Sequence, residues 1–397
     1  MIKNIFFILF LCNFIKGEEK NLALVMKPVI DLFSKEIKEY CLLNDISLSP
    51  KIKTDLNSCP RIHQLLFNDV VKIIKKSENL FLVELSQLFY QSGKKYINTF
   101  WTAKENLFLL NDYFTEKIPN PVDFKTENKK EQKIVTLISP FIDQQTEDKY
   151  SAGTRFVYFD LKDEKYNVYA FNNDSKDFKI LEIPKKFCLS NENLNKDLQI
   201  SRFVKLLKKW ANLKKGFIPY VWGGTSLIST SQDEMFEIIE KKFKEFKTQF
   251  FSYPNFNFNP KTGFDCSGLI LRAAQICSIP FYFKNTTTIS QNLKSLEIDE
   301  EIENGDLIWI PGHIIAITDV ANNKCIEARD YSHGYGKVQE IELKKLFKNI
   351  KDFKILRQNF FQKKPIERLN IKQNVIEVIT NFKILKLKSC WDWKPHN

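Results

Sequence analysis

The sequence predicts an α+β protein in which β-rich segments come first and a mixed segment of helices and strands follows. Short apolar runs separated by polar turns occupy residues 64–85 and again 133–184, as in small antiparallel β-structures. Farther along, Gly-Phe-Asp-Cys-Ser-Gly at 263–268 precedes an apolar run of helix formers at 269–276, and an apolar strand is expected at 314–317. Strands followed by mixed elements favour the α+β class or separate domains.

Length and composition fit an ordinary globular protein of several domains. The chain has 397 residues, of which 43% are hydrophobic and 27% charged. Its net charge of +12 comes from lysines spread along the whole chain, and no helix-turn-helix, zinc-finger or RNA-binding signature accompanies it. We therefore expect no nucleic-acid partner and ascribe the charge to general attraction to anionic polymers.

The N-terminal residues have the pattern of a signal peptide. Within residues 1–17, Lys3 is followed by an apolar stretch from Ile5 to Leu11. This stretch is too short to span a bilayer comfortably. We expect an exported protein, in the periplasm, cell envelope or medium, with no stable membrane span after signal cleavage. An uncleaved anchor is the alternative.

The cysteines do not indicate a metal site. Of the eight cysteines, Cys12 belongs to the expected signal peptide, so an odd number remains and at least one thiol stays free in an oxidising compartment. No pair has the spacing of metal ligands. We expect no metal and no cofactor, and interpret Cys277 and Cys325 as small buried hydrophobic residues.

Periodicity gives a coarse order of elements along the chain. A short amphipathic helix is expected over 18–44, and the β-rich runs that follow it suggest a small barrel. A helix is expected over 201–214. A long insertion at 226–262 contains a charged amphipathic helix at 233–250, and forms either a surface elaboration or a lid over a cleft.

Cys266 is the candidate nucleophile because it stands at the first turn of an expected buried helix. Unpaired backbone N–H groups and the positive end of the helix dipole stabilise an anion there. Such surroundings can lower the pKa of a thiol from about 8.5 to about 3.5–7.5. A thiolate nucleophile needs a base, and the chain has only four histidines, which are His63, His313, His333 and His396. His313 stands out because a Gly-Asp-Leu-Ile-Trp-Ile-Pro-Gly sequence precedes it and an apolar strand follows it.

Four motifs in a fixed order carry a family resemblance. They are Pro-Tyr-Val-Trp-Gly-Gly at 219–224, Gly-Phe-Asp-Cys-Ser-Gly at 263–268, Gly-Asp-Leu-Ile-Trp-Ile at 305–310 and Gly-His at 312–313. With a helix after the Cys and a strand after the His, this order resembles the NlpC/P60 family, the papain-like cysteine peptidases of bacterial cell walls. The resemblance covers roughly residues 200–358. It implies a papain-like core in which the nucleophile helix packs on an antiparallel sheet that supplies the base.

The preceding β-rich segments resemble bacterial SH3-like domains, although Asn68-Asp69 replaces the usual Gly-Glu of the opening strand. Two β-modules of another kind are the alternative. The resemblances imply five segments, namely a signal peptide at 1–17, an N-terminal helix with a first SH3-like domain at 18–125, a second SH3-like domain at 126–197, the catalytic domain at 198–358 and a basic C-terminal tail at 359–397.

The family resemblance assigns Cys266 as nucleophile, His313 as base and Glu327 as the residue that orients His313. Glu327 occupies the position where the family often has His before Ala, and a carboxylate there would hold the imidazole in one tautomer. The alternatives are that Glu327 faces the solvent on its strand, or that His333 is the third member of the triad.

Four further residues are implied as substrate contacts. Tyr220 matches the family tyrosine that lines the site, and Trp222 would form a wall of the pocket, unless both belong to an aromatic core. Asp265 and Ser267 flank the nucleophile and help to recognise the stem peptide in relatives, Asp265 through the free amine of the substrate. A helix N-cap explains Asp265 equally well. The usual Pro-Arg-x-Ser-x-x-Gln segment is replaced at 280–291, so substrate contacts from that loop are not expected by analogy.

The resemblance implies an exported cysteine peptidase that hydrolyses the γ-D-glutamyl–diamino-acid bond of peptidoglycan stem peptides or muropeptide fragments. Family members with two SH3-like domains often act on fragments with a free N-terminal L-Ala. The alternatives are an N-acetylmuramoyl-L-alanine amidase or acyltransferase with the same Cys/His chemistry, and a non-catalytic cell-wall-binding module.

Overall fold

The structure is a computed structural model that describes residues 21–34, 36, 61–110, 116–121, 132–191, 195–228, 262–330 and 336–394. Over these residues it is a mixed α/β structure with many strands and few helices. No helix in these ranges is long and apolar enough to cross a membrane. The expected signal peptide and the expected helix at 233–250 lie outside the described residues, as do His333 and His396.

The N-terminal segment forms a seven-stranded antiparallel sheet in the order β3-β2-β8-β5-β4-β1-β9. Its strands are β1 (Leu22–Val25), β2 (Val29–Phe33), β3 (Arg61–Leu66), β4 (Val70–Lys76), β5 (Leu80–Glu84), β8 (Thr99–Ala103) and β9 (Leu107–Leu109). The helix expected over 18–44 is therefore wrong over its described part. In β2 the buried residues Ile30 and Leu32 alternate with the less buried Asp31, which is the period of a strand.

A second, five-stranded sheet follows in the order β15-β14-β13-β10-β16. Its strands are β10 (Ile134–Leu137), β13 (Arg155–Lys162), β14 (Lys165–Asn172), β15 (Asp177–Pro184) and β16 (Cys188–Ser190), beside a small pair of β11 (Phe141–Ile142) and β12 (Lys149–Tyr150). Phe67 of the first segment packs its ring against Tyr150 and Phe156, with ring centroids 5.1 and 6.2 Å apart, so the two β-rich segments share a core. Neither sheet closes into a barrel over the described residues, and the expected SH3-like barrels remain a prediction.

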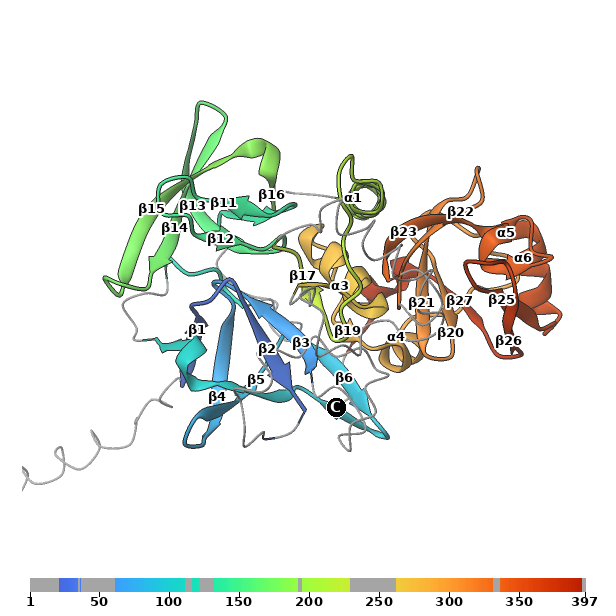
Figure 1. Ribbon diagram of the computed structural model, residues 1–397, viewed down its shortest axis with the longest axis horizontal. Coiled ribbons are helices and arrows are strands. Elements are labelled where there is room, and N and C mark those ends of the chain that lie inside the picture. Colours follow the sequence, from blue (N-terminus) through green and yellow to red (C-terminus); the bar gives the residue numbers. More distant parts are fainter. Residues whose placement is uncertain are drawn as a thin grey trace, which may run out of the picture.

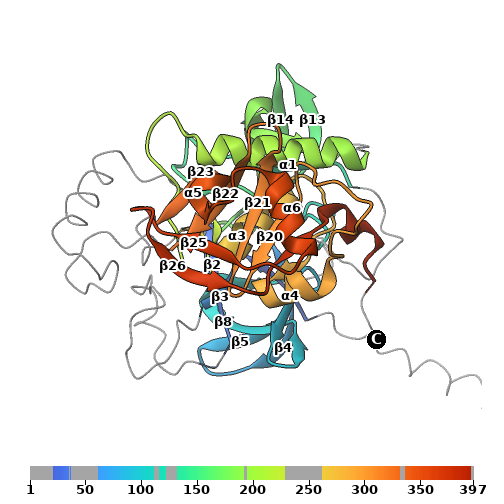
Figure 2. The ribbon, with the colours of Figure 1, turned by 90° about the vertical axis from the view of Figure 1, so that its right-hand side faces the viewer.

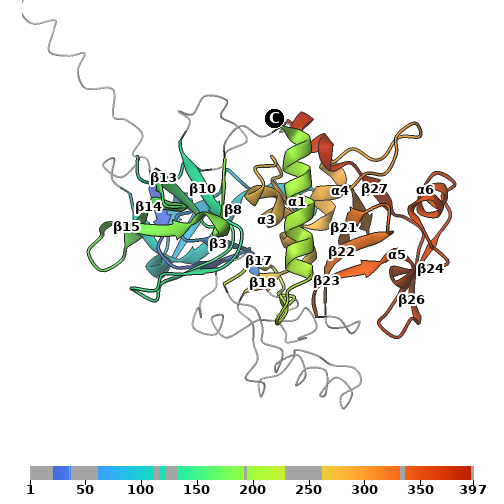
Figure 3. The same ribbon diagram turned by 90° about the horizontal axis from the view of Figure 1, so that it is seen from above.

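The core of the expected catalytic domain, the catalytic core, is a five-stranded antiparallel sheet in the order β23-β22-β21-β20-β27. Its strands are β20 (Leu307–Ile310), β21 (His313–Asp319), β22 (Lys324–Arg329), β23 (Lys337–Glu342) and β27 (Lys383–Leu385). Helices α1 (Lys196–Ala211) and α3 (Cys266–Ile276) pack on one face of this sheet, and α5 (Leu343–Leu346) and α6 (Phe353–Phe361) contribute to the core on the other face. Figures 1 and 3 show the two β-rich segments on one side of α3 and this sheet on the other side.

Burial of both sheet faces explains the continuous apolar run in β21. Ile314 and Ala316 belong to the core shared with α3, whereas Ile315 and Ile317 belong to the core shared with α6. Successive side chains of a strand point to opposite faces, so a strand that is covered on both faces needs apolar residues at every position.

A strand pair connects the N-terminal segment to the catalytic core. β6 (Phe89–Ser92), which also pairs with β7 (Lys95–Ile97), runs parallel to β19 (Phe283–Lys284), just before α4 (Thr286–Asn292). Phe89 and Phe283 each place their ring centroid 5.0 Å from that of Trp393. The short pair of β17 (Thr225–Ser226) and β18 (Gly263–Phe264) leads into α3.

Residues 359–397, expected as a basic tail, instead complete the core over their described part. β25 (Ile366–Leu369) pairs with β24 (Phe347–Lys348) and with β26 (Val375–Ile379), and this small sheet lies in front of the catalytic sheet in Figure 2. β27 then joins the edge of the catalytic sheet through β20.

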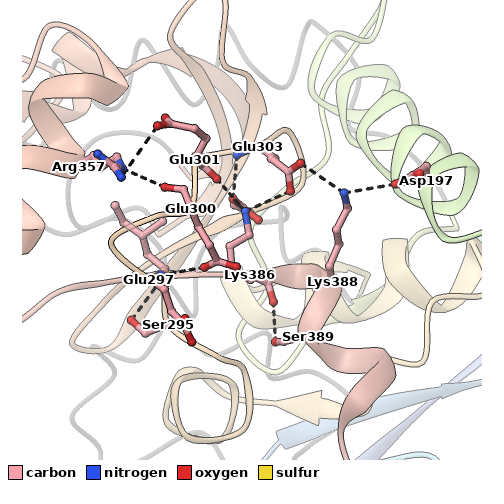
Figure 4. Close-up of polar contacts among 12 residues, drawn as sticks. Asp197, Ser295, Glu297, Glu300, Glu301, Glu303, Arg357, Lys386, Lys388 and Ser389 are labelled. Atoms are coloured by element: carbon pink, nitrogen blue, oxygen red, sulfur yellow. Dashed lines mark hydrogen bonds and ion pairs between the residues drawn. The ribbon is translucent and has the colours of Figure 1, made fainter.

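Two lysines just after β27 form ion pairs that link the C-terminal segment to the catalytic core. Lys386 Nζ lies 2.9 Å from Asp306 Oδ2 and 3.1 Å from Glu303 Oε2, and Lys388 Nζ lies 3.3 Å from Asp197 of α1. Figure 4 shows Lys386 and Lys388 reaching toward Glu303 from one side. The segment continues into a 3₁₀ turn at Leu387–Asp392.

Candidate active site

Cys266 is the first residue of α3, and its position follows from a well-formed helix start. The side chain of Asp265 caps the helix, with Oδ1 accepting the N–H of Gly268 at 2.6 Å. Gly268 allows this helix to approach the preceding loop, because a Cβ atom at this position would lie 2.0 Å from the carbonyl oxygen of Gly224. Cys266 is 8% exposed, and it lines a cavity of about 570 Å³.

His313 begins β21 and lines the same cavity as Cys266. The preceding turn is made by Pro311 and Gly312, and Gly312 has φ 76°, a conformation that favours glycine. The N–H of Ile314, the residue after His313, hydrogen-bonds to the thiol of Cys266. The structure therefore brings the expected nucleophile and the start of the strand that carries the expected base into contact.

Glu327 hydrogen-bonds to His313 from the neighbouring strand. His313 Nε2 lies 2.8 Å from Glu327 Oε2, and Glu327 is 1% exposed, so it is not a solvent-facing strand residue. A carboxylate can only accept, so the proton of the imidazole lies on Nε2 in this pair, which leaves the lone pair of Nδ1 to act as base. The structure thus brings together the pair that the family resemblance implied.

A guanidinium and an amide also donate hydrogen bonds to the Glu327 carboxylate. Arg368 of β25 donates through Nη2 to Glu327 Oε2, and Gln339 of β23 donates through Nε2 to Oε1 at 3.2 Å. Burial raises the pKa of Glu327, but Arg368, the hydrogen bond from His313 and the charge of Arg329 together hold this pKa well below its usual range. Glu327 is ionised at neutral pH.

Burial lowers the pKa of His313, against the opposing effect of Glu327. Arg368 and Arg329 add to the lowering by repelling a second positive charge. The imidazole is therefore neutral at pH 7 and can accept a proton.

The protonation state of Cys266 differs from the expectation of a lowered thiol pKa. The pKa of Cys266 is raised to about 12, mainly by burial and also by the carboxylate of Asp265, and Lys284 together with the N–H groups of Ile314 and Ser267 lowers it only in part. The helix N-terminus does favour the anion, but the removal of the sulfur from water outweighs it. The free site thus holds a neutral thiol and a neutral imidazole on one cavity, so a nucleophilic role of the sulfur would require the transfer of its proton.

Lys284 neutralises the carboxylate that flanks the nucleophile. Its Nζ lies 2.6 Å from Asp265 Oδ1, also bonds Oδ2, and lies 3.1 Å from Ser267 Oγ, which itself donates to Asp265 Oδ1 at 2.9 Å. All three residues are buried. These contacts favour the capping role of Asp265, because an ammonium group of a substrate would have to compete with Lys284 for the same oxygens.

The N-terminal β-segment supplies one wall of the cavity. Arg61 of β3 and Tyr90 of β6 line it, and Arg61 Nη1 donates to the carbonyl oxygen of Trp222 at 3.4 Å. Tyr220 and Trp222 also line the cavity, and Trp222 is 37% exposed, so it is not a core aromatic residue. The expected substrate contacts Tyr220, Trp222, Asp265 and Ser267 therefore all border the cavity that holds Cys266.

Sequence reasoning missed several residues of this site. Lys284 lies in the segment where the family pattern breaks, and Arg368 lies in the segment interpreted as a tail. Arg61 and Tyr90 lie in the β-rich region, more than a hundred residues before the nucleophile. Of these residues, only Arg368 has a local sequence feature that could have drawn attention to it, because it is a charged residue next to apolar Leu369 in a short strand.

His63 is the one other histidine within the described ranges, and it does not belong to the triad. It is 1% exposed on β3, and its Nδ1 lies 3.2 Å from Thr225 Oγ1. Burial lowers its pKa well below the usual value, and the charges of Arg272 and Lys284 lower it further. It is a neutral residue of the interface between β3 and the loop before α3.

Comparisons with known proteins identify a shared fold. An NlpC/P60 family protein from Bacillus cereus is similar in structure with a TM-score of 0.52 and 15% sequence identity, covering 81% of this chain and 94% of that chain. The peptidoglycan hydrolase RipB from Mycobacterium tuberculosis matches at 22% identity over 38% of this chain and 62% of that chain, with a TM-score of only 0.23. No family model matches the sequence. No curated protein matches it either.

Proposed function

We propose that this chain is an exported cysteine peptidase of the NlpC/P60 type that hydrolyses the γ-D-glutamyl–diamino-acid bond of peptidoglycan stem peptides. The observation that carries the proposal is the convergence of Cys266, at the start of a capped helix, and a buried His313–Glu327 pair on one cavity. The fold shared with the Bacillus cereus family protein supports it.

In the proposed reaction the Cys266 sulfur attacks the γ-carbonyl carbon of the D-glutamyl residue while His313 Nδ1 accepts the thiol proton. The resulting imidazolium is stabilised by the ionised Glu327. Collapse of the tetrahedral intermediate breaks the C–N bond, and His313 gives its proton to the departing amine. A water molecule then attacks the thioester with His313 as base, releasing the γ-carboxylate and the Cys266 thiol.

The developing oxyanion would be stabilised by backbone N–H groups at the start of α3. Tyr220, 6% exposed and lining the cavity, is placed to add its phenol O–H to the oxyanion or to the substrate. Loss of one such donor typically raises the barrier by about 3 kcal/mol. Because the free thiol is neutral, this stabilisation has to be present as the sulfur begins to attack.

The proposed substrates are muropeptide fragments in preference to intact wall. The support is the cavity wall that Arg61 and Tyr90 provide from the N-terminal β-segment, the first of the two segments that we propose are SH3-like domains. The capture of a free amine by Asp265 is not part of this proposal, since Lys284 already holds both carboxylate oxygens. Any preference for a free N-terminal L-Ala then comes from the restricted cleft.

The test is digestion of L-Ala-γ-D-Glu-diaminopimelate followed by mass spectrometry of the products. We expect release of L-Ala-D-Glu and free diaminopimelate, and slower cleavage of the N-acetylated peptide. Cys266→Ala should abolish both products, whereas Cys277→Ala, a buried thiol at the other end of α3, should retain them. Equal cleavage of both peptides would discard the fragment preference alone. Persistent cleavage by a folded Cys266→Ala protein would reject the nucleophile. In a parallel digest of the same peptide carrying an N-terminal muramoyl group, cleavage only at the muramoyl–L-Ala bond would identify an amidase.

A further inference from the structure

The third member of the triad is held by a residue from outside the catalytic sheet. Glu327 lies on β22, but Arg368 lies on β25, which pairs with β24 and β26 in the separate small sheet in front of the catalytic sheet (Figure 2). Arg368 and Glu327 are 41 residues apart in the chain, and both side chains are almost fully buried, with 3% and 0% exposure.

The contact is a short, direct ion pair. Arg368 Nη2 bonds the same oxygen, Glu327 Oε2, that accepts from His313 Nε2. A guanidinium offers its donors in a fixed plane, so this bond restricts where the carboxylate oxygen can lie. The guanidinium also lies over the ring of Phe347 at 5.2 Å, which fixes its own position.

The small sheet and β22 are joined by side-chain hydrogen bonds in both directions next to Glu327. Arg329, two residues after Glu327, donates from Nη2 to the carbonyl oxygen of Leu369 at 2.9 Å, and its Nη1 lies 4.0 Å from Glu327 Oε1. An arginine of β22 thus contacts β25, and an arginine of β25 contacts β22. The charges that act on Glu327 are His313 from β21, Arg329 from its own strand and Arg368 from β25. The buried thiol of Cys325 also lies near Glu327.

We propose that Arg368 is a positioning residue of the active site, which acts through Glu327 to hold His313 in the orientation that accepts the Cys266 proton. The C-terminal small sheet is then a required part of the catalytic apparatus. This inference rests on the proposed peptidase function, although one of its tests does not depend on the substrate.

Loss of Arg368 has a defined effect on pH dependence. Its positive charge lowers the pKa of both Glu327 and His313, so its removal raises both. The base has to be neutral to act, and a higher pKa of His313 therefore moves the acid limb of kcat/KM to higher pH. A purely structural contribution of Arg368 would reduce the amount of folded enzyme and leave the limb where it is.

The experiment compares Arg368→Met, Arg368→Lys and the control Lys348→Met over a range of pH. Lys348 lies on β24 next to β25 and is 52% exposed in an ion pair with Glu367, so its loss removes a nearby cation without touching the site. We expect Arg368→Met to lower kcat/KM at pH 7 by about tenfold or more and to raise the acid limb by about one pH unit. Arg368→Lys should restore the limb in part, and Lys348→Met should match the unchanged protein.

A second variant covers the case in which Arg368→Met does not fold. In Arg368→Met/Glu327→Gln no unpaired carboxylate remains, so the protein should fold, yet activity should stay about as low as in Glu327→Gln alone. Full activity in this double variant would overturn the inference, as would an unshifted acid limb in folded Arg368→Met.

A substrate-independent measurement separates this inference from the proposed function. Well below the thiol pKa of about 12, alkylation of Cys266 by iodoacetamide requires His313 to take the thiol proton, so its rate, followed by peptide mass spectrometry against pH, reports the ionisation of His313. A shifted profile in Arg368→Met supports the positioning role even if the unchanged protein cleaves no stem peptide, which would reject only the peptidase. An unshifted alkylation profile rejects the positioning role whatever the substrate.

Discussion

Burial controls the protonation of Cys266 and His313 in the candidate active site. It raises the pKa of Cys266 to about 12 and lowers the pKa of His313, so the free site holds two neutral groups. Glu327 remains ionised because Arg368 and Arg329 compensate its charge. In the proposed mechanism the proton therefore passes from sulfur to imidazole when a substrate carbonyl is present to take the developing negative charge.

The lowered pKa of His313 predicts activity at mildly acidic pH. His313 loses base function only when it is protonated, and burial shifts this protonation below the ordinary range near pH 6.5. We expect kcat/KM to hold as the pH falls through about 6.5, and to decline only at lower pH. A pH profile on the tripeptide substrate checks this, with the melting temperature recorded at each pH as the control. Half-maximal activity at or above the ordinary histidine value would contradict it.

Among the elements, those with strong local patterns could be predicted from the sequence. α3 and β21 were predictable because an apolar run directly follows Cys266 and another directly follows His313. β1 and β2 were mistaken for helix, because the polar residues between their short runs can also be fitted to a helical period. Strand pairing decides between these possibilities, as in the register of Leu32 with His63, and pairing between segments so far apart leaves no local signal.

The C-terminal elements were missed for a related reason. Their strands are short, and the residues that fasten them are lysines, whose side chains are usually exposed. Lys386 is instead 9% exposed at its side chain and paired with the buried Asp306 of the Gly-Asp-Leu motif. Adjacent motifs in the sequence pointed to Cys266 and His313 as candidate site residues. Nothing in the sequence showed that Arg368 and Lys284 lie at the same cavity.

The Lys386–Asp306 pair predicts a large contribution to stability from the attachment of the C-terminal segment. Lys386→Met leaves Asp306 buried beside Glu303 without its cation, and we expect the free energy of unfolding at pH 7 to fall by about 3 kcal/mol. Lys388→Met is the matched control, because Lys388 forms exposed pairs whose loss costs less than about 1 kcal/mol. Urea unfolding followed by fluorescence gives both values. Equal, small effects of the two substitutions would contradict the anchoring role of Lys386.

At the scale of the whole molecule, the N-terminal β-segment and the catalytic core form one unit. Ala23 and Leu65 share a continuous core with Leu269 and Ile314, and β6 pairs with β19 next to the cavity. The part of the cavity wall that Arg61 and Tyr90 provide would be absent from a catalytic core alone. We propose that this wall limits access to Cys266, in line with fragments as the proposed substrates.

The proposed mechanism requires a covalent acyl intermediate between Cys266 and the γ-D-glutamyl group. Rapid quenching of the enzyme with L-Ala-γ-D-Glu-diaminopimelate, followed by peptide mass spectrometry, detects such an intermediate. We expect the peptide containing Cys266 to gain the mass of an L-Ala-γ-D-Glu acyl group, and the adduct to disappear in Cys266→Ala together with product formation. Product formation that continues in folded Cys266→Ala, with no adduct on Cys266 in the unchanged enzyme, would contradict it.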